Sequence, residues 1–317
     1  MDIVALLQCL QPYVPATTLH QCSRIVRALL VMTGRITMLG ISRWAGKGGS
    51  YRTVQRLFST VLPWAMLFWV FFRQQVHCPA DVYCVAGDEV IVTKAGKHTH
   101  GLDRFFASLY GKPVPGLAFF TLSLVSVQKR RSFPMRIEQV VRSDAEKAAS
   151  KAKAAAKKPK APCAKRRPGR PKGSQNKPKA DGTCTPELRR IAGGLDALLQ
   201  LLAGVIPLTY LVLDGHFSNH HALQMARQSH LHLLSKLRDD AALYFPYTGP
   251  YAGRGPHRKY GAKVDYDNLP TQCLQETTVE GHRRPYIYQM HLLPKEFTPP
   301  LNVVIIVKTH LHTQARA

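Results

Sequence analysis

Apolar residues spaced three and four apart predict that the N-terminal part of the chain is helical. Over residues 19–30 the residues that share one helical face are Leu19, Cys22, Ile25, Val26, Leu29 and Leu30. A second, short helix is expected over residues 36–45. The apolar stretch at residues 61–72 is shorter than the roughly 20 residues that span a bilayer. We therefore expect a buried helix there, packed through Trp64, Phe68 and Phe72.

A glycine-rich turn separates the second helix from a third. The turn is Gly46-Lys47-Gly48-Gly49, and Ser50 follows it at the position of a helix N-cap. Buried positions are expected at Tyr51, Val54, Leu57 and Phe58, which leaves Arg52, Gln55 and Arg56 facing outward. A helix, a glycine turn and a helix with an exposed Arg/Gln face are typical of a helix-turn-helix that reads DNA. An ordinary helical bundle with a solvated basic face is the alternative.

The pattern then changes to short apolar runs that favour strands buried in a sheet. One run covers residues 82–86, ends at Gly87-Asp88-Glu89 and resumes at 90–92. A turn-rich segment at 111–116 precedes another strand at 119–127. Farther along we expect helices at 186–203 and 219–228, strands at 208–213 and 301–307, and a β-rich piece over 239–300. The mixture predicts an α/β fold.

A basic segment interrupts this pattern. Residues 147–179 hold 13 Lys or Arg, five Pro and no acid. Such a composition cannot bury enough apolar surface to offset its ordering entropy. We therefore expect a disordered basic loop over residues 143–185.

The charge of the whole chain points to a polyanionic partner. There are 44 Lys+Arg against 19 Asp+Glu in 317 residues, a formal net charge of +25, and the apolar content of 45% suffices for a globular core. Nucleic acid is the first candidate, because lysine and arginine side chains that neutralise its phosphates release bound counterions, and this release favours binding. The seven cysteines are scattered without a Cys-x-x-Cys pair, which argues against a zinc ribbon or a disulfide framework. With no secretory signal visible, we expect a cytoplasmic, nucleoid-associated protein without a membrane contact.

Asp88 and Asp214 stand out because each follows a short apolar strand. Ligands bind at the carboxyl ends of strands in α/β sheets. Two carboxylates brought together there would repel one another unless a divalent cation neutralised them. A pair of such ions can activate water against a phosphodiester. Strand-end aspartates are also common turn formers, and Asp214-Gly215 fits a turn equally well.

Three segments resemble a bacterial insertion-sequence transposase of the DDE type. They are Arg35 to Trp44, Gly87-Asp88-Glu89 with the downstream Lys94-Ala95-Gly96-Lys97-His98, and Tyr210 to Phe217. The resemblance runs from about residue 20 to the end. It implies a ribonuclease-H-like fold, with Asp88 and Asp214 as the first and second catalytic carboxylates and Mg²⁺ (or Mn²⁺) as cofactor. It also implies hydrolysis of a phosphodiester at the element's end and joining of the 3′-hydroxyl to target DNA.

The chain departs from this family in its third carboxylate, a Glu on a helix beyond the β-rich insertion. Residues 239–300 look like that insertion and residues 301–307 like the strand after it, and residues 308–317 contain no acid. The Glu residues after Asp214 are Glu276, Glu280 and Glu296, all within the insertion-like piece. We therefore expect a transposase truncated at its C-terminus and impaired in cleavage. If it is not truncated, the third ligand is to be sought among those three residues.

The basic segment carries a second resemblance. Residues 165–174 resemble an AT-hook, in which an extended Arg-Gly-Arg-like backbone enters a narrow minor groove. The residues assigned to DNA there are Lys165, Arg166, Arg167, Arg170 and Lys172. A polybasic tether that contacts phosphates without sequence preference is the alternative.

Together these observations predict a helical DNA-binding domain at 1–78 and a ribonuclease-H-like core at 79–317. The expected function is DNA transposition, with double-stranded element ends and target DNA as partners. The main alternative is a non-catalytic transposase remnant that occupies element ends; an RNA-associated basic protein would explain the charge but not the placement of the aspartates. Transposases commonly act as dimers, so a homodimer is one candidate assembly, although no heptad run marks it.

Overall fold

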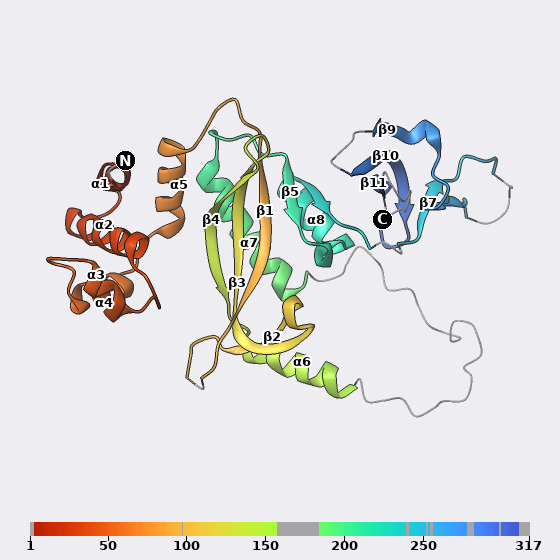
Figure 1. Cartoon of the computed structure of the whole chain (residues 1–317). Helices are drawn as coiled ribbons and strands as arrows, with labels where there is room; N and C mark the ends of the chain where they lie inside the picture. Colours follow the sequence, from red (N-terminus) through yellow and green to blue (C-terminus); the bar gives the residue numbers. More distant parts are fainter. Residues whose placement is uncertain are drawn as a thin grey trace. The chain divides into compact units, whose positions relative to one another are not determined.

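The computed structural model describes residues 3–96, 98–156, 184–238, 241–251, 253, 256–277, 282–297 and 299–310 (Figure 1). The chain divides into two compact units. The first comprises Met1–Val212 with Met225–Leu234, and the second Leu213–Gln224 with Ser235–Ala317.

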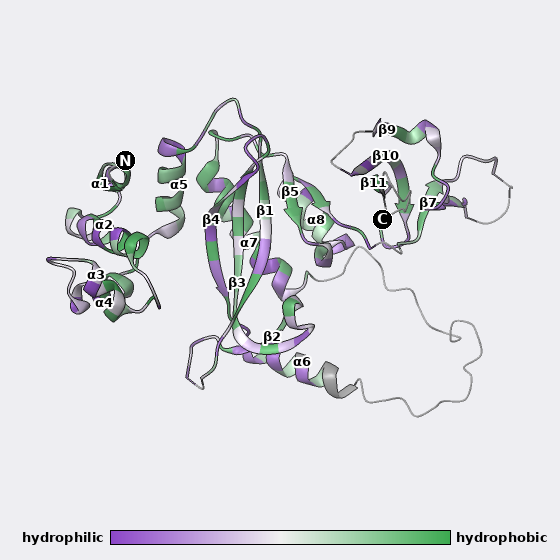
Figure 2. Ribbon diagram, in the orientation of Figure 1, coloured by the Kyte–Doolittle hydropathy of each residue, from purple (hydrophilic) through white to green (hydrophobic). Residues whose placement is uncertain are grey.

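The N-terminal part of the first unit is helical, as the apolar spacing predicts. Its elements are α1 (Ile3–Leu7), η1 (Gln8–Leu10), α2 (Ala16–Val31), α3 (Met38–Trp44), α4 (Tyr51–Ser59) and α5 (Trp64–Gln75). They share an apolar core that includes Ile25, Ala28, Ile41, Val54 and Leu57. Figure 2 shows α5 as mostly hydrophobic with a hydrophilic end.

Several side chains predicted to be buried in these helices are exposed instead. They are Tyr51, Phe58 and Trp64, and Leu29 and Leu30 at the end of the apolar face of α2 are exposed as well. Short helices that pack through a narrow stripe leave the flanking apolar positions in water, and singly exposed apolar residues are common on protein surfaces. The prediction for Phe72 is confirmed, because it is 1% exposed.

The first unit also contains, apart from the last residues of β5 and β6, a six-stranded sheet in the order β2-β3-β1-β5-β6, with β4 paired to β3. The strands are β1 (Tyr83–Thr93), β2 (Asp103–Ala107), β3 (Lys112–Ser126), β4 (Arg131–Val140), β5 (Tyr210–Leu213) and β6 (His232–Ser235). β1 and β3 pair antiparallel without interruption from Tyr83↔Ser126 to Thr93↔Gly116. The fold is α/β, as predicted.

Two strand boundaries differ from the prediction because ladder pairing overrides local turn signals. The segment at 111–116, expected as a turn, contributes residues 112–116 to β3, where they pair with β2. The expected break of β1 at Gly87-Asp88-Glu89 is absent too, since all three residues pair with β3. The only left-handed residue at that β2–β3 connection is Gly111, with φ +60°.

The remaining described helices are α6 (Asp144–Ala156), α7 (Pro186–Leu202) and α8 (His220–Gln228), and α7 contacts β4 of the sheet. α7 and α8 lie where the sequence predicts them. The expectation of a loop from residue 143 is wrong over residues 144–156, because α6 occupies them. Alanine is the strongest helix former, and it outweighs the charge of the scattered lysines. Residues 157–183 lie outside the described residues.

The second unit holds a five-stranded sheet in the order β11-β10-β7-β8, with β9 paired to β10. Its strands are β7 (Leu243–Pro246), β8 (Tyr260–Lys263), β9 (Leu274–Thr277), β10 (Arg283–Pro294) and β11 (Leu301–His310). The 3₁₀ turn η5 (Thr271–Cys273) precedes β9. Leu292 and Met290 of β10 pack with Leu243 and Val303 in its core.

β11 corrects one expectation. The sequence indicates residues 301–307 as the strand that follows the β-rich insertion rather than as part of it. Instead β11 pairs antiparallel with β10, from Arg283↔His310 to Leu292↔Leu301, within the second sheet. The alternating apolar pattern of β11 favours a strand but does not specify its partner, and the adjacent β10 was available through a short connection.

No single helix among the described residues is long and apolar enough to cross a membrane. α4 and α5 pass that test only when taken together, and they meet at a bend of 98°.

Candidate functional site

Asp88 lies in the middle of β1, not beyond the end of a strand as the sequence suggested. Its Cα is opposite Thr121 of β3. Because side chains alternate along a strand, buried Val85 points to one face and exposed Asp88 to the other. The Oδ1 atom of Asp88 accepts a hydrogen bond of 2.8 Å from the backbone N–H of Glu89. The pleat therefore presents this carboxylate to solvent from a rigid strand.

Asp214 follows β5 directly, as predicted. It caps the 3₁₀ turn η4 (Gly215–Phe217), and its Oδ1 accepts a hydrogen bond of 2.6 Å from the backbone N–H of Gly215. Its backbone oxygen accepts a hydrogen bond of 2.9 Å from the hydroxyl of Ser235. The side chain is exposed. The turn-forming role that the sequence left open is therefore real, and it engages one of the two carboxylate oxygens.

The sheet order relates the two strands that carry these residues. β5 is the neighbour of β1, on the side opposite to β3. Each aspartate accepts a hydrogen bond from the N–H of the following residue. Such local bonds fix the direction of a carboxylate and leave further oxygen lone pairs available to another ligand. Oxygen atoms of this kind suit a hard cation such as Mg²⁺.

Other candidate ligands are not gathered into a metal site in the described part of the chain. No group of three or more His, Cys, Asp or Glu residues with a metal-binding arrangement is found there. The ring of His216 contacts Phe217 edge-on, with 5.2 Å between ring centroids. Glu276 and Glu296 are exposed in the second unit, and Glu280 lies outside the described residues.

The turn predicted at residues 46–49 is confirmed. Gly46 and Gly48 have φ values of +68° and +84°, which favour glycine. Ser50 caps α4, accepting a hydrogen bond of 3.3 Å from the backbone N–H of Thr53. The guanidinium of Arg24 donates to the Gly48 carbonyl oxygen across 3.3 Å and so ties the turn to α2.

On α4 the polar face lies where the sequence placed it. Val54 and Leu57 are buried, whereas Arg52, Gln55 and Arg56 are exposed. Arg52 and Arg56 are one helical turn apart and therefore lie on one side of the helix. The assignment of these three residues to DNA contact stays a prediction. The residues assigned to DNA in the basic segment, Lys165, Arg166, Arg167, Arg170 and Lys172, lie outside the described residues.

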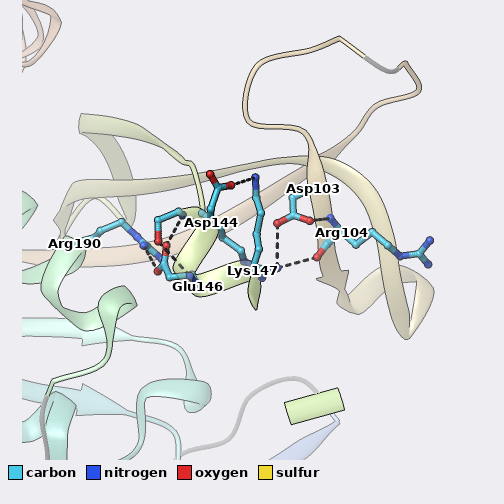
Figure 3. A network of polar contacts seen from close by, with 8 residues as sticks. Asp103, Arg104, Asp144, Glu146, Lys147 and Arg190 are labelled. Carbon is cyan, nitrogen blue, oxygen red and sulfur yellow. Dashed lines mark hydrogen bonds and ion pairs between the residues drawn. The ribbon is translucent and has the colours of Figure 1, made fainter. Parts of the chain in front are cut away.

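A network of charged residues links β2, the end of β4, α6 and α7, and sequence analysis missed it (Figure 3). Arg142 contacts Asp103 at 3.6 Å and donates to the Arg104 carbonyl oxygen across 3.1 Å. Its guanidinium also lies 4.5 Å above the ring of buried Phe105. On the other side of the network, Arg190 of α7 donates to Glu146 of α6 across 2.8 Å.

A sequence signal for part of this network existed. Ser143 and Glu146 have the spacing of a capping box. The backbone N–H of Ser143 donates to Glu146 across 2.7 Å, and the N–H of Glu146 donates to the Ser143 hydroxyl across 3.3 Å. The hydrogen bond from Arg190, joined by the one from Ser143, lowers the pKa of Glu146 from its ordinary value. The basic, proline-rich composition of residues 147–179 favoured a loop, although the capping box just before them marks the start of α6.

The cavity with a volume of about 730 Å³ in the first unit is separate from the predicted site. It lies among α5, β4 and α7, and its lining includes Trp64, Phe68 and Ile137. None of the predicted site residues lines it.

Comparison with known families gives one match over most of the chain. The model of the family described as "DDE superfamily endonuclease" matches residues 6–289. No curated protein matches the chain. The family match agrees with the resemblance carried by the segments around Asp88 and Asp214.

Proposed function

We propose, because this chain belongs to the DDE superfamily of endonucleases, that it is the DNA transposase of an insertion sequence. Members of that superfamily have a ribonuclease-H-like fold. The proposal assigns DNA as the substrate and phosphodiester cleavage, followed by strand transfer, as the reaction. The observation that carries it is the position of the two aspartates, on β1 and directly after the neighbouring strand β5 of one sheet, in a chain matched to this family.

Asp88 and Asp214 are the residues proposed to hold Mg²⁺ or Mn²⁺. Their carboxylate oxygens fit such an ion, because both side chains are exposed. The hydrogen bond from the neighbouring N–H engages only Oδ1 of each carboxylate, so that Oδ2 can face a ligand. When bound, the ion would activate water and stabilise the leaving oxygen. The chain itself orients the two carboxylates. The β1–β3 ladder fixes the backbone of Asp88, and η4 together with Ser235 fixes the backbone of Asp214.

The positive charge that favours a polyanionic substrate comes from parts of the chain other than the two aspartates. Arg52, Gln55 and Arg56 are exposed on one helix that starts at a well-formed cap. We propose that this helix contacts duplex DNA at element ends, with the two arginines on phosphates or base edges. The basic segment would add affinity that is independent of sequence.

A nicking assay tests the proposal. The whole purified chain is incubated with DNA that contains its own gene and the flanking sequences, in Mg²⁺ or Mn²⁺. We expect metal-dependent nicking that falls by about two orders of magnitude in Asp88→Asn and in Asp214→Asn. Asp265→Asn is the matched control, because Asp265 is also exposed and its Oδ1 also accepts a local backbone N–H, from Asp267 across 3.1 Å.

Two outcomes would contradict the proposal. Nicking that persists in both aspartate variants would place cleavage at other residues. Tight binding of the flanking DNA without nicking in either metal would favour the alternative function, a remnant that occupies element ends. In that case Asp88→Ala and Asp214→Ala should bind DNA as well as the wild-type chain or slightly better, because negative charge near phosphate has been removed.

A further inference from the structure

The hairpin formed by β7 and β8 in the second unit combines aromatic and basic side chains. Residues 241–264 contain no Asp or Glu. Their aromatic residues are Tyr244, Phe245, Tyr247, Tyr251 and Tyr260, and their basic residues are Arg254, Arg258, Lys259 and Lys263. Aromatic rings interleaved with cations are the composition of surfaces that bind single-stranded nucleic acid.

Two tyrosine rings near the hairpin tip each contact another side chain, one a guanidinium group and the other an imidazole ring. The guanidinium of Arg258 lies 5.0 Å from the centre of the Tyr247 ring. The rings of Tyr251 and His257 are stacked, with 4.1 Å between centroids and 25° between planes. Tyr251 is 49% exposed, and His257 is exposed as well. The tip thus presents a flat stacked pair, and the next residue after His257, Arg258, lies over the ring of Tyr247.

A second group lies at the base of the same hairpin. The ring of Tyr244 contacts that of Tyr260, with 5.4 Å between centroids. The ammonium group of Lys295, just beyond β10, lies 5.2 Å from the centre of the Tyr244 ring. Because Tyr244 and Tyr260 belong to paired strands, the ladder fixes this group in place. The hairpin therefore repeats one arrangement, a ring with a cation over it, at its base and at its tip.

Three cations of the hairpin that the structure describes are not neutralised by carboxylates. Within the described residues, Arg258, Lys259 and Lys263 are exposed and form no ion pair with Asp or Glu. The contrast is with Arg142 and Arg190 of the first unit, which contact Asp103 and Glu146. Unneutralised arginine and lysine side chains attract phosphate, and binding of phosphate releases counterions.

From these contacts we infer that the β7–β8 hairpin binds single-stranded DNA, with unpaired bases stacked on Tyr251 and His257 and phosphates held by Arg258 and Lys259. Duplex DNA does not use this surface in the same way, because the faces of its bases are already stacked on one another and only base edges and the backbone are accessible. The inference rests on DNA as the substrate but not on cleavage, so binding is tested in EDTA.

Fluorescence anisotropy of labelled oligonucleotides measures the effect in the whole chain. We expect Tyr251→Ala combined with His257→Ala to weaken single-strand binding about ten-fold, and duplex binding by no more than about two-fold. Tyr251→Phe keeps the ring and should bind as the wild-type chain does. Tyr110→Ala is the matched control, since Tyr110 is 51% exposed at a turn of the first unit.

A second measurement needs no variant. Photo-crosslinking of wild-type protein to a single strand that contains 5-iodouracil should attach the base to aromatic residues between 244 and 260. Crosslinks elsewhere, an equal loss of single-strand and duplex binding in the double variant, or no loss at all would overturn the inference. So would a single-stranded RNA that binds much more tightly than DNA of the same sequence. Failure of nicking with these results intact would leave the hairpin inference standing and remove only the proposed catalytic function.

Discussion

Arg190 of α7 and Glu146 of α6 form an ion pair, with 2.8 Å between Nη1 and Oε1, across 43 intervening residues of sequence. Glu146 belongs to a capping box with Ser143 at the start of α6. The ion pair therefore fixes the first turn of α6, the helix that contains the start of the basic segment. α7 packs against the core sheet through Leu122 and its neighbours.

We expect Arg190→Gln to lower the free energy of unfolding by about 0.5–1 kcal/mol near neutral pH, because both side chains are partly exposed to water. The pKa of Glu146 is lowered in the folded chain. Its contribution is therefore present above the pKa of an unfolded glutamate and is lost as pH falls through the folded value. Urea unfolding at several pH values measures this. Lys147→Gln is the control, since its partner Asp144 is fully exposed; an equal loss there would contradict the expectation.

Phe72 joins the helical part of the first unit to the sheet. Its ring contacts those of Phe133 on β4 and Tyr83 on β1, with centroids 5.2 Å and 5.6 Å away. We expect Phe72→Ala to cost about 3–5 kcal/mol of stability, because it opens a cavity at a buried site. Phe106→Ala, at a side chain that is 62% exposed, should cost far less. Chemical denaturation of both variants compares the two costs, and similar losses would show that Phe72 is not a packing centre.

Local patterns predicted the elements of this fold better than their partners. Ser50 as a cap, α7, α8 and the end of β5 at Leu213 all follow from nearby residues. β11 shows the opposite case, because its own residues predict a strand but the sheet that it joins depends on β10. Gly87-Asp88 has the local chemistry of a turn, yet pairing with β3 keeps it in a strand. Pairing between distant residues is invisible to a short window of sequence.

The candidate site follows the same division. Asp88 and Asp214 could be selected because both lie next to apolar runs in a chain poor in acids. That β1 and β5 are neighbours depends on sheet order, which no single motif encodes. The Arg142 network escaped prediction because Asp103, Phe105 and Arg142 are brought together by β2 and β4 pairing with the same strand, β3.

Arg52 and Arg56 should contribute to DNA binding through phosphates or bases. If both contact phosphates, Arg52→Ala with Arg56→Ala should weaken duplex binding and reduce the slope of log K against log salt by about two. Anisotropy titrations of duplex DNA over a range of salt concentrations measure that slope. A matched pair of substitutions, Lys129→Ala with Arg131→Ala, removes two exposed cations at the β3–β4 turn. A slope unchanged by the first pair, or changed equally by both, would argue against contact through α4.

The basic segment should dominate the binding that is independent of sequence. Deleting residues 157–183 removes ten of the 44 Lys and Arg residues and leaves α6 in place. We expect the salt slope for random duplex DNA to fall by several units, because each lost phosphate contact removes about one. If the segment acts as an AT-hook, the loss of affinity is greater for A·T-rich than for G·C-rich duplexes. An unchanged slope would exclude both roles.

Asp81 gives the first unit a second source of pH dependence. Its carboxylate accepts hydrogen bonds from the Ser126 hydroxyl and, across 3.4 Å, from the backbone N–H of Gln128. The same hydroxyl accepts the N–H of Lys129 across 3.0 Å. The start of β1 is thereby tied to the β3–β4 turn. The hydrogen bond from Ser126 lowers the pKa of Asp81, so folding favours its ionised form and the stabilisation is present above the unfolded aspartate pKa.

We therefore expect stability to fall as the pH is lowered through the folded pKa of Asp81. Asp81→Asn should lower stability near pH 7 and flatten the dependence in the acid range, because asparagine keeps an acceptor oxygen but does not titrate. The same substitution at Asp196, an exposed residue that accepts one hydrogen bond from Ser229, is the control. Urea midpoints measured from neutral to acid pH test this, and a variant that keeps the full wild-type acid sensitivity would show that other carboxylates carry it.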